Sequence, residues 1–173
     1  MRRTTKRVAG LSAVVLAGAA FGPLDAAFAG HENAVLTTEL NGPNEVPATG
    51  ETRGNVGDPD GRGEAYVFGI DGDEKTLCYV LTVDDIATAT AAHIHEGPPG
   101  KNGPVVVNLA APADGNAADC LTEGEQDKFV AGENGELLTT VAEILDRPED
   151  YYVNVHNAEY PGGAIRGQLA AER

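Results

Sequence analysis

The 173-residue sequence has no tryptophan, only one methionine, only two cysteines and few basic residues, with 12 Lys and Arg against 27 Asp and Glu. The formal net charge is −15, although four of the twelve basic residues lie within the first seven positions. Phosphate backbones and anionic lipid surfaces repel so acidic a chain. The composition therefore excludes nucleic acid as a partner, while 42% hydrophobic residues suffice for one buried core.

The sequence also lacks an apolar run of the roughly 20 residues that a membrane-spanning helix needs. Its longest run, VAGLSAVVLAGAAFG, is shorter and follows a basic head, MRRTTKR. Ala27 and Ala29 then supply the small residues that a signal peptidase reads. We expect a signal peptide over residues 1–29, cleaved after Ala29, in preference to a retained anchor. The mature chain, residues 30–173, is expected to be secreted and to form a single domain.

The two cysteines are Cys78 and Cys120. Their spacing fits neither a C-x-x-C redox motif nor a zinc pattern. Outside the cytosol, an isolated pair of cysteines is most often a disulfide. We therefore predict a bond between Cys78 and Cys120, which stabilises the fold by about 3–4 kcal/mol in the chain-entropy estimate.

Short segments rich in β-branched and aromatic residues alternate with Gly, Pro, Asn and Asp turns along the rest of the chain. Because no βαβ rhythm is present, the pattern predicts an all-β fold, a Greek-key-like antiparallel sandwich or barrel of about seven to eight strands. The expected strands are residues 34–40, 64–70, 76–83, 89–95, 104–109, 151–156 and 164–169. Two short helices are expected in one long connection, the first from a capping box at Thr122 and Glu125 to Gly132, the second within residues 136–146.

Three of the four histidines fall on two of these strands. His93 and His95 are two residues apart, so both side chains leave the same face of a strand. Alternation in YYVNVH places His156 on the face opposite to Val153 and Val155. If the two strands are neighbours, the three imidazoles converge, and we predict a metal site formed by His93, His95 and His156.

Copper and zinc both suit imidazole ligands, and copper is favoured because it binds more tightly in the usual affinity order. Glu96, Glu159 and Tyr160 are near in sequence as further donors. Cleavage after Ala29 would also leave a Gly30-His31 terminus that can chelate copper. Calcium is an alternative ion, because carboxylates of acidic loop residues suit it, although the EF-hand spacing is missing. These loop residues are Asp58, Asp60, Asp71, Asp73 and Glu74.

Three stretches carry a resemblance to a known family: LNGPNEVP (40–47), AHIHEGPPGKNGPVVVNL (92–109) and YVNVHNAEYPGGAIRGQL (152–169). Together they closely resemble the CHRD domain, which is named after the animal protein chordin and occurs also in secreted microbial proteins. The resemblance covers about residues 34–170 and implies an extracellular binding module without naming its partner. The chain departs from the family pattern at Ala164, where members often have Glu.

Two functions remain open at this point. The first is an exported copper-type metal-binding domain, and the second is a metal-free extracellular module that binds a protein or matrix. An enzyme is less favoured: the H-x-H strand resembles that of copper–zinc superoxide dismutases, but the domain has too few histidines for both metals, and no hydrolase or P-loop motif is present. The Gly/Pro-rich loop 97–104 is expected to cover the imidazoles. Arg166 is expected to have a structural role, either paired with a carboxylate of the acidic loops or as a solvated edge charge.

Overall fold

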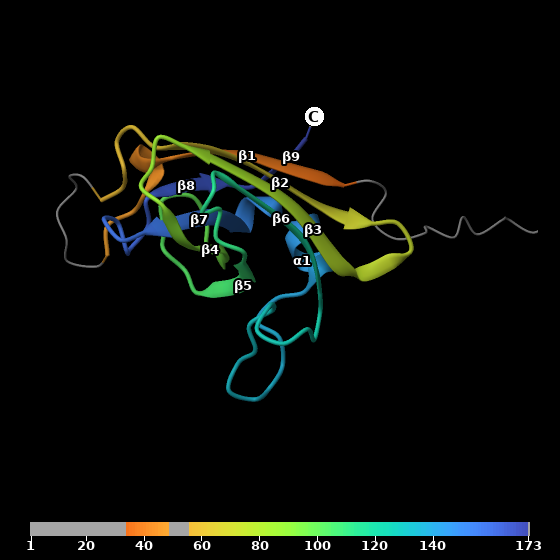
Figure 1. Ribbon diagram of the computed structural model, residues 1–173. Coiled ribbons are helices and arrows are strands. Elements are labelled where there is room, and N and C mark those ends of the chain that lie inside the picture. Colours follow the sequence, from red (N-terminus) through yellow and green to blue (C-terminus); the bar gives the residue numbers. More distant parts are fainter. Residues whose placement is uncertain (1–33, 49–55, 173) are drawn as a thin grey trace, which may run out of the picture.

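The structure, a computed structural model, describes residues 34–48 and 56–172 (Figure 1). The expected signal peptide, its cleavage site and His31 lie outside the described residues. The described part contains nine strands, one α-helix and two 3-10 helices. No helix in this part is long and apolar enough to span a membrane.

Strands dominate the described chain from end to end. The elements in chain order are β1 (Val35–Asn41), η1 (Gly42–Asn44), β2 (Arg62–Ile70), β3 (Asp73–Asp84), β4 (Ala89–Glu96), β5 (Val105–Leu109), β6 (Asn116–Thr122), α1 (Val141–Asp146), η2 (Pro148–Asp150), β7 (Tyr151–Asn157), β8 (Ile165–Gln168) and β9 (Ala170–Ala171). All seven predicted strands are present, with small differences at their ends. β6 and β9 are additional, and β6 has the sequence NAADCLT, which is poor in the residues that mark a strand.

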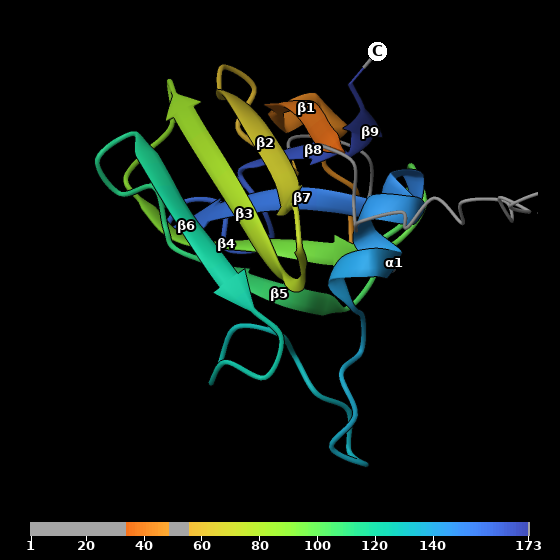
Figure 2. The same ribbon diagram turned by 90° about the vertical axis from the view of Figure 1, so that its right-hand side faces the viewer.

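All strand pairs are antiparallel, in the order β5-β4-β7-β8-β1-β2-β3-β6, with β9 paired to β1. The sheet curls over, so that β2, β3 and β6 cross in front of β4, β5 and β7 (Figure 2). The chain after β6 runs beside β5, the strand at the other end of the sheet, because Val130 N–H donates to the Val106 carbonyl at 2.9 Å. This contact narrows the gap between the two ends of the sheet. The predicted all-β, antiparallel, barrel-like fold is confirmed.

The hydrophobic core lies between the two halves of the curled sheet. Alternate residues of each strand face it, as the period of two requires. Ile144 of α1 is fully buried in the same core, which fixes the helix against the sheet. Large buried members come from six strands: Leu36, Val67, Leu81, Ile94, Val153 and Ile165.

One of the two predicted helices is present. α1 begins later than expected because Thr140 caps it, with its hydroxyl accepting from Glu143 N–H and the Glu143 carboxylate accepting from Thr140 N–H. The other prediction, a helix from Thr122 to Gly132, is wrong, and the segment forms turns instead. Gly124 and Asp127 have φ angles of 84° and 62°, a left-handed conformation through which an α-helix does not continue.

The predicted disulfide is present between β3 and β6. Cys78 and Cys120 are directly opposite one another in the register, and their sulfurs are bonded at 2.03 Å. β6 is the last strand at its end of the sheet and pairs only with β3. The covalent bond therefore holds an edge strand that hydrogen bonds support on one side.

Candidate metal centre

The two strands that carry the three histidines are neighbours. In the antiparallel register of β4 and β7, His93 lies opposite Asn154, His95 opposite Tyr152, and His156 opposite Ala91. The intervening apolar residues of both strands point into the core. The histidines therefore share the opposite side of the sheet, as their alternation predicts.

The three imidazole rings lie close together. The ring centroids are 5.6 Å apart for His93 and His95, 5.0 Å for His93 and His156, and 6.3 Å for His95 and His156. One ring nitrogen of each residue lies within 4.8 Å of those of the other two. This arrangement could hold one ion.

Backbone carbonyls orient two of the rings. His95 Nδ1 lies 3.0 Å from the Gly103 carbonyl oxygen, and His156 Nδ1 lies 3.1 Å from that of Pro161. A carbonyl only accepts, so each Nδ1 carries the hydrogen and each Nε2 keeps its lone pair in the neutral ring. His93 Nδ1 lies 3.1 Å from His156 Nε2 and donates to it.

His95 Nε2 is the atom that this network leaves without a partner. The residue is 9% exposed, and Nε2 is the one buried side-chain nitrogen or oxygen in the described part of the chain that makes no hydrogen bond. An unpaired buried polar atom costs free energy of about 1–3 kcal/mol, so it points to a missing partner.

The three rings are neutral near pH 7. Burial lowers the pKa of His93 to about 4, and the neighbouring rings of His156 and His95 lower it further. Burial also lowers the pKa of His95 and of His156. A neutral imidazole has the lone pair that a metal ligand needs, so the environment keeps the cluster in its ligand-competent form.

A stack of side chains supports His95 from behind. The Tyr152 ring is parallel to the His95 ring, with an interplanar angle of 7° and a centroid distance of 4.7 Å. The Arg166 guanidinium carbon lies 3.4 Å from the centroid of the same Tyr152 ring. Of the two alternatives for Arg166, the solvated edge charge is excluded, because the residue is 2% exposed. Arg166 stacks on one side of the Tyr152 ring and His95 on that same ring, so Arg166 belongs to the layer that supports the histidine cluster.

The Gly/Pro-rich loop between β4 and β5 lies against the rings, as predicted. Gly103 accepts from His95 through its carbonyl and donates its N–H to the Tyr152 hydroxyl oxygen at 3.2 Å. A Cβ at Gly103 would overlap the Glu96 carbonyl, so this close approach needs glycine. Asn102 accepts from Arg166 and donates to the carbonyls of Val46 and Pro47.

Glu45 is the charged group that the sequence reasoning missed. Its carboxylate accepts a hydrogen bond from Asn154 Nδ2 and packs against Gly163, where a Cβ would lie 2.6 Å from the carboxylate atoms. Burial raises the pKa of Glu45 to about 7, although the Asn154 hydrogen bond and the Arg166 charge oppose this shift. No regular spacing links Glu45 to the histidines, so only the fold brings it near.

These residues occupy what we call the covered face, the outer side of β4, β7 and β8, over which the loops and the segment after η1 fold. The covered face carries His93, His95, Tyr152, Asn154, His156 and Arg166.

The other predicted ligands do not join this cluster. In residues 34–48 and 56–172, the histidine trio is the one group of three or more His, Cys, Asp or Glu arranged to share an ion. The acidic residues of the calcium alternative make local turn contacts instead, such as Asp58 with Asp60 N–H and Asp73 with Lys75 N–H. The calcium alternative therefore gains no support.

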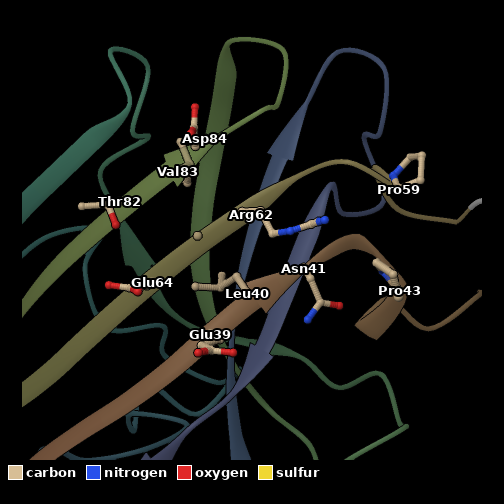
Figure 3. A pocket seen from close by; sticks show the side chains of 11 residues that line it. Glu39, Leu40, Asn41, Pro43, Pro59, Arg62, Glu64, Thr82, Val83 and Asp84 are labelled. Atoms are coloured by element: carbon tan, nitrogen blue, oxygen red, sulfur yellow. The ribbon is translucent and has the colours of Figure 1, made fainter.

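A hollow of about 720 Å³ lies elsewhere, on the outer side of β1, β2 and β3 (Figure 3). Figure 3 shows Glu39, Glu64, Asp84 and Arg62 around this hollow, with the Arg62 guanidinium directed toward Asn41 and away from the three carboxylates. Further along the same side, Tyr66 and Val80 are 41% and 40% exposed. We call the outer side of β2 and β3, which carries Arg62, Glu64, Tyr66, Val80 and Thr82, the open face. It is separate from the histidine cluster.

The fold and the covered face together define an all-β domain with three neutral, converging imidazoles. Comparison with protein-family profiles matches residues 36–169 to the CHRD domain. The chain therefore belongs to the CHRD domain family, as the resemblance indicated. No curated protein and no solved structure matches the chain.

Proposed function

We propose that this protein is an exported CHRD domain that binds one transition-metal ion, copper in preference to zinc, through His93, His95 and His156. The observation that carries the proposal is the buried His95 Nε2, which makes no hydrogen bond. Ring nitrogens of His93 and His156 lie near enough to share an ion with His95. Imidazole suits both metals, and copper has the higher affinity in the usual order.

The distances fit a shared ion after small side-chain rotations. Two bonds of about 2.0–2.1 Å span at most about 4 Å, whereas the three nitrogens lie within 4.8 Å of one another. The hydrogen bond between His93 and His156 is replaced when an ion binds between these rings. The carbonyl contacts of His95 and His156 stay in place and hold both rings in orientation.

Export rests on two supports. CHRD domains are typically extracellular, and the Cys78–Cys120 disulfide suits an oxidising compartment. The proposed signal peptide is residues 1–29, and the proposed mature domain is residues 30–173. Amino-terminal sequencing of the secreted protein tests this, with Gly30 expected as the first residue and retention of residues 1–29 as the contrary result.

Elemental analysis of the purified mature protein tests metal binding. We expect about one copper ion per chain in the wild type and none in a His93→Ala/His95→Ala/His156→Ala variant. His31→Ala is made in both the wild type and the triple variant, because it removes the Gly30-His31 chelate and leaves the cluster intact, and it is expected to change neither result. Equal metal content in the wild type and the triple variant would contradict the proposal, provided that both have the same circular dichroism spectrum.

A second candidate is a metal-free extracellular binding module. The open face favours it, because the hollow of about 720 Å³ adjoins the exposed side chains of Tyr66 and Val80. Capture of an extracellular partner that persists after chelation and is lost in Tyr66→Ala distinguishes this function from metal binding.

A further inference from the structure

The histidine cluster offers a metal ion no negative charge. Its three ligands are neutral imidazoles, and among the described residues no carboxylate belongs to the group that could share an ion. Any charge that an ion brings into this half-buried centre therefore has to be offset by more distant groups.

The charged side chain stacked behind His95 and Tyr152 is a cation. Arg166 is 2% exposed and stacks on the Tyr152 ring, which in turn stacks on His95. Its guanidinium donates to Asn102 Oδ1 at 3.1 Å and to the Lys101 carbonyl at 2.7 Å, both of them uncharged acceptors. The salt bridges of the described chain involve Lys128 and Arg147, not Arg166. The positive charge beside the centre is thus not neutralised by a direct ion pair.

Glu45 offsets this charge only in part. It is the carboxyl group that interacts electrostatically with Arg166, and burial raises its pKa to about 7. At neutral pH, Glu45 is therefore about half ionised and offsets only part of the Arg166 charge.

Such surroundings discriminate by ionic charge. The free energy of burying an ion grows with the square of its charge, so a divalent ion costs about four times as much as a monovalent one of the same size. Repulsion from Arg166 is also twice as large for the divalent ion. Three nitrogen donors suffice for Cu(I), which has a closed d shell and accepts low coordination numbers, whereas Zn(II) bound by three histidines also takes a water as its fourth ligand.

We propose that Arg166 acts as a fixed positive charge that makes the three-histidine centre selective for monovalent copper, Cu(I), over Cu(II) and Zn(II). This inference rests on the proposed function, because it assumes that the three histidines bind a metal ion. Arg166 is here a positioning and charge-setting residue and does not itself contact the ion.

The first test compares metal affinities of the wild-type mature protein. Competition against chromogenic chelators, anaerobically with ascorbate for Cu(I) and without it for Cu(II) and Zn(II), gives the three dissociation constants. We expect tighter binding of Cu(I) than of either divalent ion. Tighter binding of Cu(II) overturns the inference and leaves the proposed function intact. Tighter binding of Zn(II) overturns both the inference and the proposed preference for copper, and failure to bind any of the three overturns the metal site itself.

The second test removes the charge. In Arg166→Met, we expect the ratio of Cu(II) to Cu(I) affinity to rise about tenfold or more, which lowers the reduction potential of bound copper by about 59 mV or more. Arg62→Met removes the same charge from the open face and is expected to leave the ratio unchanged. An unchanged ratio in a folded Arg166→Met protein contradicts the inference. Arg166→Gln is the alternative neutral variant if the methionine variant does not fold, and the wild-type comparison remains decisive in either case.

Discussion

The covered face and the open face belong to one continuous sheet and share one hydrophobic core, yet they expose very different chemistry. On β7, both sides are buried: Val153 and Val155 face the core, while Tyr152 and Asn154 lie under loops. On β2 and β3, one side is buried in the core, and Glu64, Tyr66 and Val80 on the other side face solvent.

The two faces differ in how many polar side chains they bury. Burying a polar side chain is unfavourable unless it is hydrogen bonded. On the covered face, Asn154 donates to Glu45 and to the Ile165 carbonyl, and Arg166 donates to two acceptors, so nearly every polar atom is paired. The exception is His95 Nε2, the atom at the centre of the cluster.

The largest expected contrast comes from the same substitution on the two faces. Tyr152→Ala removes a 2% exposed ring that stacks on His95 and supports Arg166, and we expect the free energy of unfolding to fall by about 3–5 kcal/mol. Tyr66→Ala removes a 41% exposed ring from the open face, and we expect a loss of about 1 kcal/mol or less. Urea unfolding of both variants measures the difference; losses of equal size would show that the covered face is not a packed layer.

The next effect concerns the edge of the open half of the sheet. Cys78→Ser/Cys120→Ser removes the covalent link between β3 and β6, and we expect a loss of about 3–4 kcal/mol by the chain-entropy estimate. The wild type in excess dithiothreitol is the control and should unfold at the same urea concentration as the variant. A midpoint unaffected by both treatments would mean that the strand pairing alone holds β6.

The smallest expected effect is a pH dependence confined to the covered face. The folded-state pKa of Glu45 is about 7, above its ordinary value of 4.5, so the folded chain holds this proton more tightly than the unfolded chain. The contribution of Glu45 to stability is complete below about pH 4.5 and is lost as the pH rises through about 7, a change of about 3 kcal/mol.

Glu45→Gln cannot ionise, so its stability relative to the wild type is expected to increase by that amount between pH 4 and pH 8. The comparison of the two proteins cancels the opposite contribution of the histidines, whose pKa values are lowered in both. Glu64→Gln on the open face is the matched control and should track the wild type. Parallel curves for wild type and Glu45→Gln from urea titrations at each pH would contradict the role given to Glu45.

The strands and the histidine cluster could be predicted from the sequence because both follow from alternation. In a strand of period two, a pattern such as YYVNVH fixes which side chains share a face without knowledge of the partner strand. The disulfide followed from the number of cysteines and the expected compartment. β6 was missed because NAADCLT has little hydrophobic signal, and its position depends on the cross-strand bond through Cys120.

The remainder of the covered face could not be read from the chain. Glu45 and Arg166 lie far apart in sequence and meet only because β8 pairs with both β7 and β1. An arginine on a four-residue strand near one end of the sequence looks like an exposed edge residue until the loop between β4 and β5 folds over it. Local patterns locate the ligands, whereas their electrostatic environment is set by contacts between distant segments.

The hydrogen bonds of Asn102 to Val46, Pro47 and Arg166 join three distant parts of the chain at one point. During synthesis or translocation from the amino terminus, the H-x-H pair emerges long before His156 and β8. If the three histidines bind an ion as proposed, the early chain offers only two of the ligands and lacks Arg166. The site is then complete only after β7 and β8 have emerged, so selective binding of an ion cannot begin before the last strands are made.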